Sequence, residues 1–213
     1  MPRAYHQECP IAKGLDVLGE RWTLLILREL IGGARRYADL RAALPGIATN
    51  LLADRLRELE AADLIERSEL PPPVARTVYS LTGVGWAKVL PVIRAVATFG
   101  MDLVELTADA VTPVNGFLAG ILLGFDDPTA HSGADASYRV DIDERRFEFA
   151  VRDGRPSKPH GPPVVTVTAS AADLIYSRLG PTASGRRAAL GRVKFDGDAK
   201  AVSTFKKVFR LSA

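Results

Sequence analysis

The apolar side chains between residues 49 and 62 recur at the spacing of an α-helix. Three leucines fall at i, i+4 and i+7 and so share one helix face: Leu52, Leu56 and Leu59. The opposite face begins with the small polar side chains of Thr49 and Asn50. A helix with a buried apolar face and a small polar outer face fits the major groove of DNA. The pattern therefore predicts a recognition helix over this segment.

The neighbouring segments complete a DNA-binding arrangement. Residues 37–44 are predicted to form a short support helix, followed by a Pro-Gly turn. Downstream, residues 64–70 and 77–81 are predicted to pair as a hairpin. Three consecutive prolines at its tip cannot continue a strand, because proline has no backbone N–H to donate. Arg76 closes this tip, so the order predicts a helix-turn-helix with a wing, which is a winged helix.

Apolar helices are predicted on both sides of this winged helix. Two of them span residues 10–18 and 22–31. Thr82 is a suitable N-cap for a long helix to about residue 107, which Pro91 should kink or split. This long helix keeps an apolar stripe: Val89, Val92, Ile93, Val96, Phe99, Leu103 and Leu106. We expect a second copy of the chain to cover the stripe; packing on the C-terminal half is the alternative.

The composition changes at residues 109–113, which we interpret as a linker between two domains, 1–110 and 113–213. The second domain should begin with an apolar helix over residues 115–125. Four strands are predicted from period-two alternation or short apolar runs: 137–142, 145–152, 164–168 and 193–196. Further helices are expected over residues 171–179 and after Asp198, a suitable N-cap. The predicted fold class is therefore α+β, a winged helix followed by an α+β domain.

Charge and composition narrow the classes of partner. The 213 residues carry a net charge of +3, yet residues 1–110 hold 13 Lys and Arg against 14 Asp and Glu. Positive charge must therefore be positioned locally if the first domain neutralises phosphates. No stretch is long and apolar enough for a membrane helix, and no secretion segment precedes the first helix. A single cysteine excludes an internal disulfide, so we expect a cytoplasmic protein without a membrane partner, and the Ala-rich, Arg-over-Lys composition favours a bacterial source.

Enzymatic chemistry finds little support in the sequence. His6, His131 and His160 lie far apart, and none stands at metal-ligand spacing from another His or Cys. The chain has no G-x-S-x-G motif, no phosphate-binding loop and no dinucleotide fingerprint. We therefore expect no enzyme activity, no metal and no cofactor.

The first half of the chain resembles the HxlR-type transcriptional regulators, a winged-helix branch related to the MarR group. The resemblance covers roughly residues 5–105 and is carried by six segments: 9–10 (CP), 15–19 (LDVLG), 21–30 (RWTLLILREL), 44–47 (LPGI), 55–59 (RLREL) and 79–82 (YSLT). It implies a homodimeric regulator, expected to be a repressor, that binds a pseudo-palindromic operator in double-stranded DNA. The expected DNA contacts are Arg36, Thr49, Asn50, Arg55, Arg57 and Arg76.

These contacts should differ in what they read. Arg36 should touch phosphate, whereas Thr49 and Asn50 should face base edges, where an asparagine can bind adenine with two hydrogen bonds. Arg76 should enter the minor groove beside the recognition helix.

Two of the arginines have an alternative role on the same helix. Glu58 and Asp54 lie within ion-pairing reach of Arg55 and Arg57, so either arginine could be structural. The sequence also departs from the family pattern, because Ala48 stands where a hydroxyl residue usually caps this helix.

Cys9 matches the place where some HxlR-type regulators carry a cysteine that senses oxidants or electrophiles. It stands at a helix start, where the helix dipole favours the thiolate. The alternative is a small buried hydrophobe, the usual state of a lone cysteine. With one cysteine per chain, a disulfide would have to be intermolecular or formed with a small thiol.

The second half resembles the sterol-carrier-protein-like fold over about residues 113–211. Three segments carry the resemblance: 164–170 (VVTVTAS), 173–174 (DL) and 191–198 (GRVKFDGD). It implies a hydrophobic tunnel that takes up lipid-like or other apolar effectors. The expected lining is Phe117, Ile121, Phe125, Phe147, Phe149, Val167, Leu174, Phe195 and Phe205.

Two alternatives stay open for this domain and for the whole chain. The same side chains could fill a solid core, in which case the domain would add only dimer contacts. The main alternative function is a lipid- or acyl-binding protein whose winged helix serves protein interaction.

Overall fold

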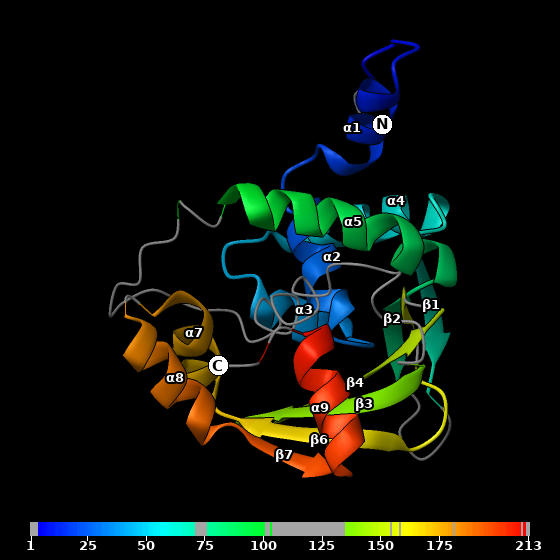
Figure 1. Ribbon diagram of the computed structural model, residues 1–213. Coiled ribbons are helices and arrows are strands. Elements are labelled where there is room, and N and C mark those ends of the chain that lie inside the picture. Colours follow the sequence, from blue (N-terminus) through cyan, green and yellow to red (C-terminus); the bar gives the residue numbers. More distant parts are fainter. Residues whose placement is uncertain are drawn as a thin grey trace. The chain divides into compact units, whose positions relative to one another are not determined.

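The chain divides into two compact units, Met1–Phe99 and Gly100–Ala213. The computed structural model (Figure 1) describes residues 4–70, 76–100, 103, 135–153, 155–157, 159–180, 182–209 and 211. The predicted linker and the predicted helix over residues 115–125 lie outside these residues. None of the described helices is long and apolar enough to cross a membrane.

The first unit contains five helices and one hairpin among its described residues. In chain order they are α1 (Pro10–Leu18), α2 (Thr23–Ile31), α3 (Tyr37–Ala43), α4 (Thr49–Ala61), β1 (Ile65–Glu69), β2 (Thr77–Leu81) and α5 (Gly83–Gly100). The first four predicted helices and the predicted hairpin are confirmed to within a few residues. α5 confirms the first part of the long helix predicted to about residue 107, whose remaining residues lie mostly outside the described part of the chain. The unit is a helix-turn-helix followed by a wing, with α5 returning after the wing.

The leucine face of α4 is buried as predicted. Leu52, Leu56 and Leu59 are at most 2% exposed, and Leu40 of α3 is fully buried. Together with the buried side chains of α2, they form the core beneath the recognition helix. The face of α4 that looks outward is therefore fixed by the face that is buried.

The wing pairs in the antiparallel register Ile65↔Leu81 to Glu69↔Thr77. Its tip is closed by the Leu70 N–H, which donates to the Arg76 carbonyl at 2.9 Å. A third segment joins the hairpin at one residue: the Arg35 N–H donates to the Tyr79 carbonyl at 2.9 Å, and the Tyr79 N–H donates back at 2.7 Å. The wing is thus tied to the residues that lead into α3.

Thr82 caps α5 as predicted, because its hydroxyl accepts the Gly85 N–H at 2.8 Å. Gly85 packs closely on the backbone of Leu64: a Cβ built on Gly85 would stand 2.0 Å from the Leu64 carbonyl oxygen. The predicted split at Pro91 is wrong, since α5 continues through it to Gly100. Pro91 and Ala87 are both exposed, so water can solvate the Ala87 carbonyl that loses its helix partner.

The second unit is a five-stranded sheet with helices. Its elements are β3 (Ala136–Ile142), β4 (Arg145–Arg152), β5 (Arg155–Ser157), β6 (Pro163–Ala169), α7 (Ala171–Leu179), α8 (Ala183–Arg192), β7 (Lys194–Gly197) and α9 (Ala199–Val208). The strand order is β5-β4-β3-β6-β7, with β3 and β6 parallel and the other pairs antiparallel. All four predicted strands and both predicted helices in the described part are confirmed.

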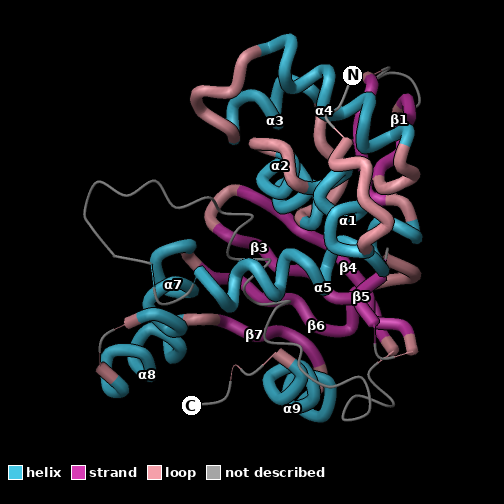
Figure 2. The backbone as a smooth tube through the Cα atoms, turned by 90° about the horizontal axis from the view of Figure 1, so that it is seen from above, coloured by secondary structure: helices cyan, strands magenta, loops and turns pink. Residues whose placement is uncertain are grey.

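Two elements of the second unit were not predicted. β5 is three residues long and contains a proline, so it has no alternation to detect. α8 contains two glycines and no apolar stripe, and its start depends on Thr182, whose hydroxyl accepts the Gly185 N–H at 3.1 Å. α7 and α8 pack together at one end of the sheet (Figure 2). Arg192 donates to Asp173 at 2.7 Å and thereby lowers the pKa of that carboxyl.

Candidate nucleic-acid interface

The outer face of α4 carries the predicted base-reading residues at its N-terminal end. Thr49 and Asn50 are both exposed. Their backbone is held from α3, because the Tyr37 hydroxyl donates to the Thr49 carbonyl at 2.5 Å. The Asn50 side-chain oxygen accepts the Leu51 N–H at 3.0 Å, which leaves the amide NH₂ directed away from this bond. The first turn of α4 is therefore positioned by its neighbour and presents small polar groups.

The N-terminus of α4 has no side-chain cap. Ala48 stands at the N-cap with extended backbone angles, φ −70° and ψ 142°, and has no side-chain oxygen to accept an N–H of the first helix turn. Although the Leu51 N–H donates to Asn50, the helix dipole and the other N–H groups of the first turn make this end suited to a phosphate of the DNA backbone.

The predicted phosphate and wing contacts lie on neighbouring elements of the same unit. Arg36 precedes α3 and is half-buried, and its backbone N–H donates to Asp39 at 3.2 Å. Arg76 is exposed at the closing residue of the wing. Residues 71–75 of the wing tip lie outside the described part of the chain.

Arg57 is exposed on the outer face of α4 and pairs there with Asp54. Its side chain is 74% exposed, so the ion pair is solvated and contributes little to stability. An exposed arginine held this loosely can exchange its carboxylate for a phosphate. The geometry thus leaves Arg57 available to DNA.

Arg55 differs from Arg57 in burial. Its side chain is only 11% exposed and pairs with Glu58 of α4 and, at 3.0 Å, with Glu20 in the turn between α1 and α2. A guanidinium enclosed by two carboxylates has no free edge to offer a phosphate. The burial favours the structural alternative for Arg55.

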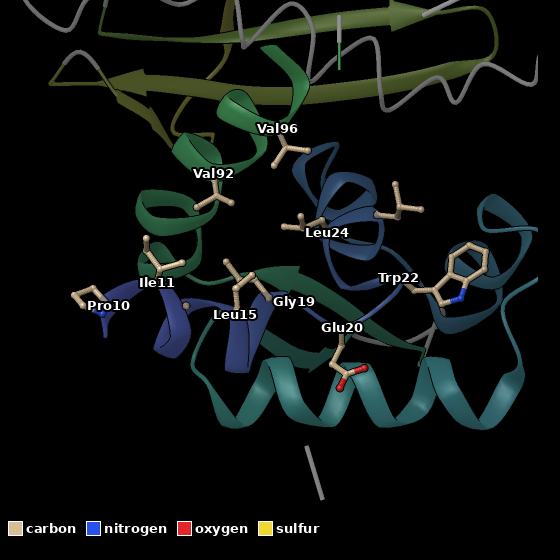
Figure 3. Close-up of a pocket in the computed structure, with 12 residues that line it drawn as sticks. Pro10, Ile11, Leu15, Gly19, Glu20, Trp22, Leu24, Val92 and Val96 are labelled. Atoms are coloured by element: carbon tan, nitrogen blue, oxygen red, sulfur yellow. The ribbon is translucent and has the colours of Figure 1, made fainter. Parts of the chain in front are cut away.

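An apolar groove of about 650 Å³ lies elsewhere in the first unit, between α1, α2 and α5. Figure 3 shows Ile11 and Leu15 of α1, Leu24 of α2, and Val92 and Val96 of α5 around it. Four of the large apolar side chains that line it are exposed: Ile11, Leu15, Leu25 and Val96. Phe99, one turn further along α5, is exposed as well. The apolar stripe predicted for α5 is therefore buried at its beginning and uncovered at its end.

Trp22 is a residue whose role the sequence did not reveal. Its backbone is left-handed, with φ 78°, a conformation that costs roughly 1–3 kcal/mol in a non-glycine residue. Trp22 is one of the residues that line the groove, and its ring lies beside Gly46 in the α3–α4 turn, where a Cβ would stand 3.8 Å from it. Trp22 therefore joins the α1–α2 turn to the turn of the helix-turn-helix.

Cys9 is the N-cap residue of α1 and is half-buried. Its side chain makes no cap hydrogen bond. A redox role for this thiol stays a prediction.

The expected effector pocket of the second unit is partly described. Phe117, Ile121 and Phe125 lie outside the described residues. Of the rest, Phe147, Phe149, Val167, Leu174 and Phe205 are buried and Phe195 is half-buried. Aromatic rings pack on one another here, with centroids 5.1 Å apart for Tyr138 and Phe205 and 4.5 Å apart for Phe205 and Phe209. A cavity among these side chains stays a prediction.

The first unit is similar in sequence to known helix-turn-helix transcriptional regulators. The family profile described as HxlR-like helix-turn-helix matches residues 17–108. An uncharacterized HTH-type transcriptional regulator of Synechocystis is 42% identical over 97 residues, which cover 46% of this chain and 71% of that protein. The uncharacterized HTH-type regulator YvaP of Bacillus subtilis is 33% identical over 98 residues, covering 46% and 90%. The HTH-type regulator YodB of the same organism is 36% identical over 80 residues, covering 37% and 71%.

The uncapped start of α4 gives a prediction for stability. Ala48→Ser supplies a hydroxyl at an N-cap with suitable backbone angles, so we expect the free energy of unfolding to rise by about 1 kcal/mol. Urea unfolding followed by tryptophan fluorescence measures this change in the first unit, which holds both tryptophans, Trp22 and Trp86. Ala61→Ser makes the same change in the last turn of α4, where no N–H is open, and should stabilise nothing. Equal effects of the two variants would contradict the assignment.

Proposed function

The chain belongs to the HxlR-like family of helix-turn-helix transcriptional regulators, and we propose that it works as a homodimer that represses transcription by binding a pseudo-palindromic operator. The observation that carries the proposal is the orientation of α4. Its leucines are buried, while Thr49, Asn50 and Arg57 are presented outward, and Arg76 of the wing is exposed as well. Repression needs only that the dimer occupy a site where polymerase must bind.

Each outward side chain has a distinct part in this proposal. Thr49 and Asn50 meet base edges in the major groove, and the Asn50 amide suits adenine. Arg57 leaves Asp54 for a phosphate, and Arg36 touches the backbone beside α3. Arg76 extends the contact into the adjacent minor groove. Arg55 takes no part in direct contact, since its guanidinium is buried between two carboxylates.

The dimer is supported by the apolar groove and by the exposed end of α5. Phe99 is 79% and Ile11 73% exposed in the single chain, which is costly for side chains that lie on helix faces with apolar neighbours. A second copy that places its own α5 and α1 here covers both surfaces at once. The two recognition helices then face successive major grooves, as two-fold symmetry requires.

We propose further that the second unit senses an apolar effector. The support is a sheet whose inner face is lined with aromatic side chains and covered by α9 (Figure 1). The rings of Phe205 on α9 and of Phe209 at its C-cap contact Tyr138 and Phe149 on the sheet, so a ligand at this place has to displace α9. That displacement is a change of state by which an effector can alter DNA affinity.

The wing contact predicts a specific salt dependence. Arg76→Ala removes one phosphate-neutralising charge per monomer, so operator affinity should fall and the slope of log K against log salt should fall by about one unit per monomer. Fluorescence anisotropy with the labelled upstream region of the chain's own gene measures both. Lys88→Ala removes an equal charge from the exposed face of α5 and should leave the slope unchanged. An unchanged slope in Arg76→Ala removes the wing from the interface.

If the groove is the dimer interface, a charge placed in it should separate the two copies. Val96→Asp buries a carboxylate in the interface, so the dimer dissociation constant should rise at least 100-fold, roughly 3 kcal/mol. Sedimentation velocity measures the change. Thr98→Asp places the same charge on the exposed side of α5, as the matched control. If Val96→Asp stays as dimeric as Thr98→Asp, the groove is not the interface.

The effector proposal predicts uptake of a dansyl-labelled fatty acid by the second unit. We expect saturable fluorescence enhancement that an unlabelled fatty acid reverses, and a changed affinity in Phe205→Leu, which alters the ring cluster beneath α9. Val96→Asp is the control, because the groove of the first unit is also apolar. Uptake that is lost in Val96→Asp and kept in Phe205→Leu would place the probe in the wrong unit.

A further inference from the structure

The turn between α1 and α2 contacts both the apolar groove and the helix-turn-helix. Glu20 and Trp22 stand in this turn, and both line the groove. Glu20 also pairs with Arg55 of α4, and Trp22 also lies beside Gly46 in the α3–α4 turn. Figure 3 shows Glu20 extending from the turn toward the recognition helix. A molecule that fills the groove therefore contacts the α1–α2 turn, which in turn contacts α4.

Arg55 makes the polar part of this connection. Its guanidinium lies between Glu20 Oε2, at 3.0 Å, and the carboxylate of Glu58 on its own helix. Glu58 travels with α4, so its ion pair does not restrain the helix relative to the rest of the unit. Glu20 is 35 residues away in the chain, and its ion pair does restrain the helix. The two carboxylates thus touch the same side chain but have different mechanical effects.

The burial of Arg55 makes the loss of its ion pair with Glu20 costly. The Arg55 side chain is 11% exposed, and both carboxylates are only partly exposed. A cation removed from water needs its partners, because losing one leaves part of the charge desolvated and unpaired. The planar fork of arginine can reach two carboxylates at fixed angles, which a lysine cannot do. Arg55 therefore fixes the angle of α4 to the α1–α2 turn.

We propose that Arg55 is a positioning residue, and that its ion pair with Glu20 couples the filling of the groove by a second copy to the DNA-reading orientation of α4. When the groove is filled, the turn is held from one side, and Glu20 holds the recognition helix from the other. When the groove is empty, the turn and α4 are free to shift together. The inference rests on the proposed dimeric DNA-binding function and adds the route by which the two are linked.

Two charge-matched variants separate this role from direct DNA contact. Glu20→Gln and Glu58→Gln each remove one negative charge and one carboxylate partner of Arg55. We expect Glu20→Gln to bind the labelled upstream duplex about tenfold more weakly than Glu58→Gln, with the salt slope unchanged, because no phosphate contact is lost. Equal affinities would overturn the proposal. A steeper slope in Glu20→Gln would also overturn it, because it would mean that a freed Arg55 binds phosphate.

Hydrogen exchange of the full chain tests the coupling without DNA. Peptides covering residues 49–61 are followed over a dilution series that spans dimer dissociation. In the wild type and in Glu58→Gln, protection of α4 should rise with dimer formation, whereas in Glu20→Gln the rise should be lost. Coupled exchange without any DNA binding would mean that the proposed function fails and this inference stands. DNA binding with identical exchange in both variants would mean the reverse.

Discussion

The burial of three leucines beneath α4 is the constraint on which the rest of the first unit depends. Leu52, Leu56 and Leu59 are almost fully removed from water, and each contributes about 1.5–3 kcal/mol. No polar contact on the outer face of α4 approaches that sum, since its exposed ion pair contributes less than about 1 kcal/mol. The apolar face therefore decides how the helix lies, and the outer face is free to carry residues chosen for a partner.

This separation of the two helix faces explains why the proposed interface carries little net positive charge. Asp54 and Glu60 stand on the same helix as Arg57, and residues 1–110 have a slight excess of acidic side chains. One copy of the unit offers few cations to the DNA backbone, so affinity has to come from presenting them twice. The exposed apolar end of α5 and the groove beside it are the surface that we propose for this second copy. In this account, DNA binding depends on dimer formation, and the α1–α2 turn connects the dimer surface to the recognition helix.

Much of the fold could be predicted from the sequence, because strong periodicity marks buried faces. The helix of Leu52 and the strand of Phe147 follow from apolar spacing of 3.6 and 2, and the hairpin was placed by the three prolines at its tip. α8 was not predicted because it has no apolar stripe. Of the kink or split expected at Pro91, the split is wrong, because an exposed proline leaves the unpaired carbonyl of Ala87 to water.

The candidate site was predictable only in part, because some of its contacts join residues that are far apart in the sequence. Spacing along one helix brings Glu58 and Asp54 within reach of Arg55 and Arg57, but it cannot say which arginine is buried. The contact of Arg55 with Glu20 crosses 35 residues and exists only once α4 packs against the α1–α2 turn. The left-handed backbone of Trp22 likewise has no signal in the spacing of the sequence. Sequence reasoning thus identifies the surface proposed to face DNA and misses the contacts that hold it in place.

The central claim is that a symmetric pair presents two recognition helices to one duplex. Hydroxyl-radical footprinting of the full chain on the upstream region of its own gene tests it most directly. The account predicts two protected patches related by a two-fold axis, with centres about one helical turn, roughly 10.5 base pairs, apart or a multiple of it. A single patch without a symmetric partner, or uniform cleavage at low salt, would contradict it.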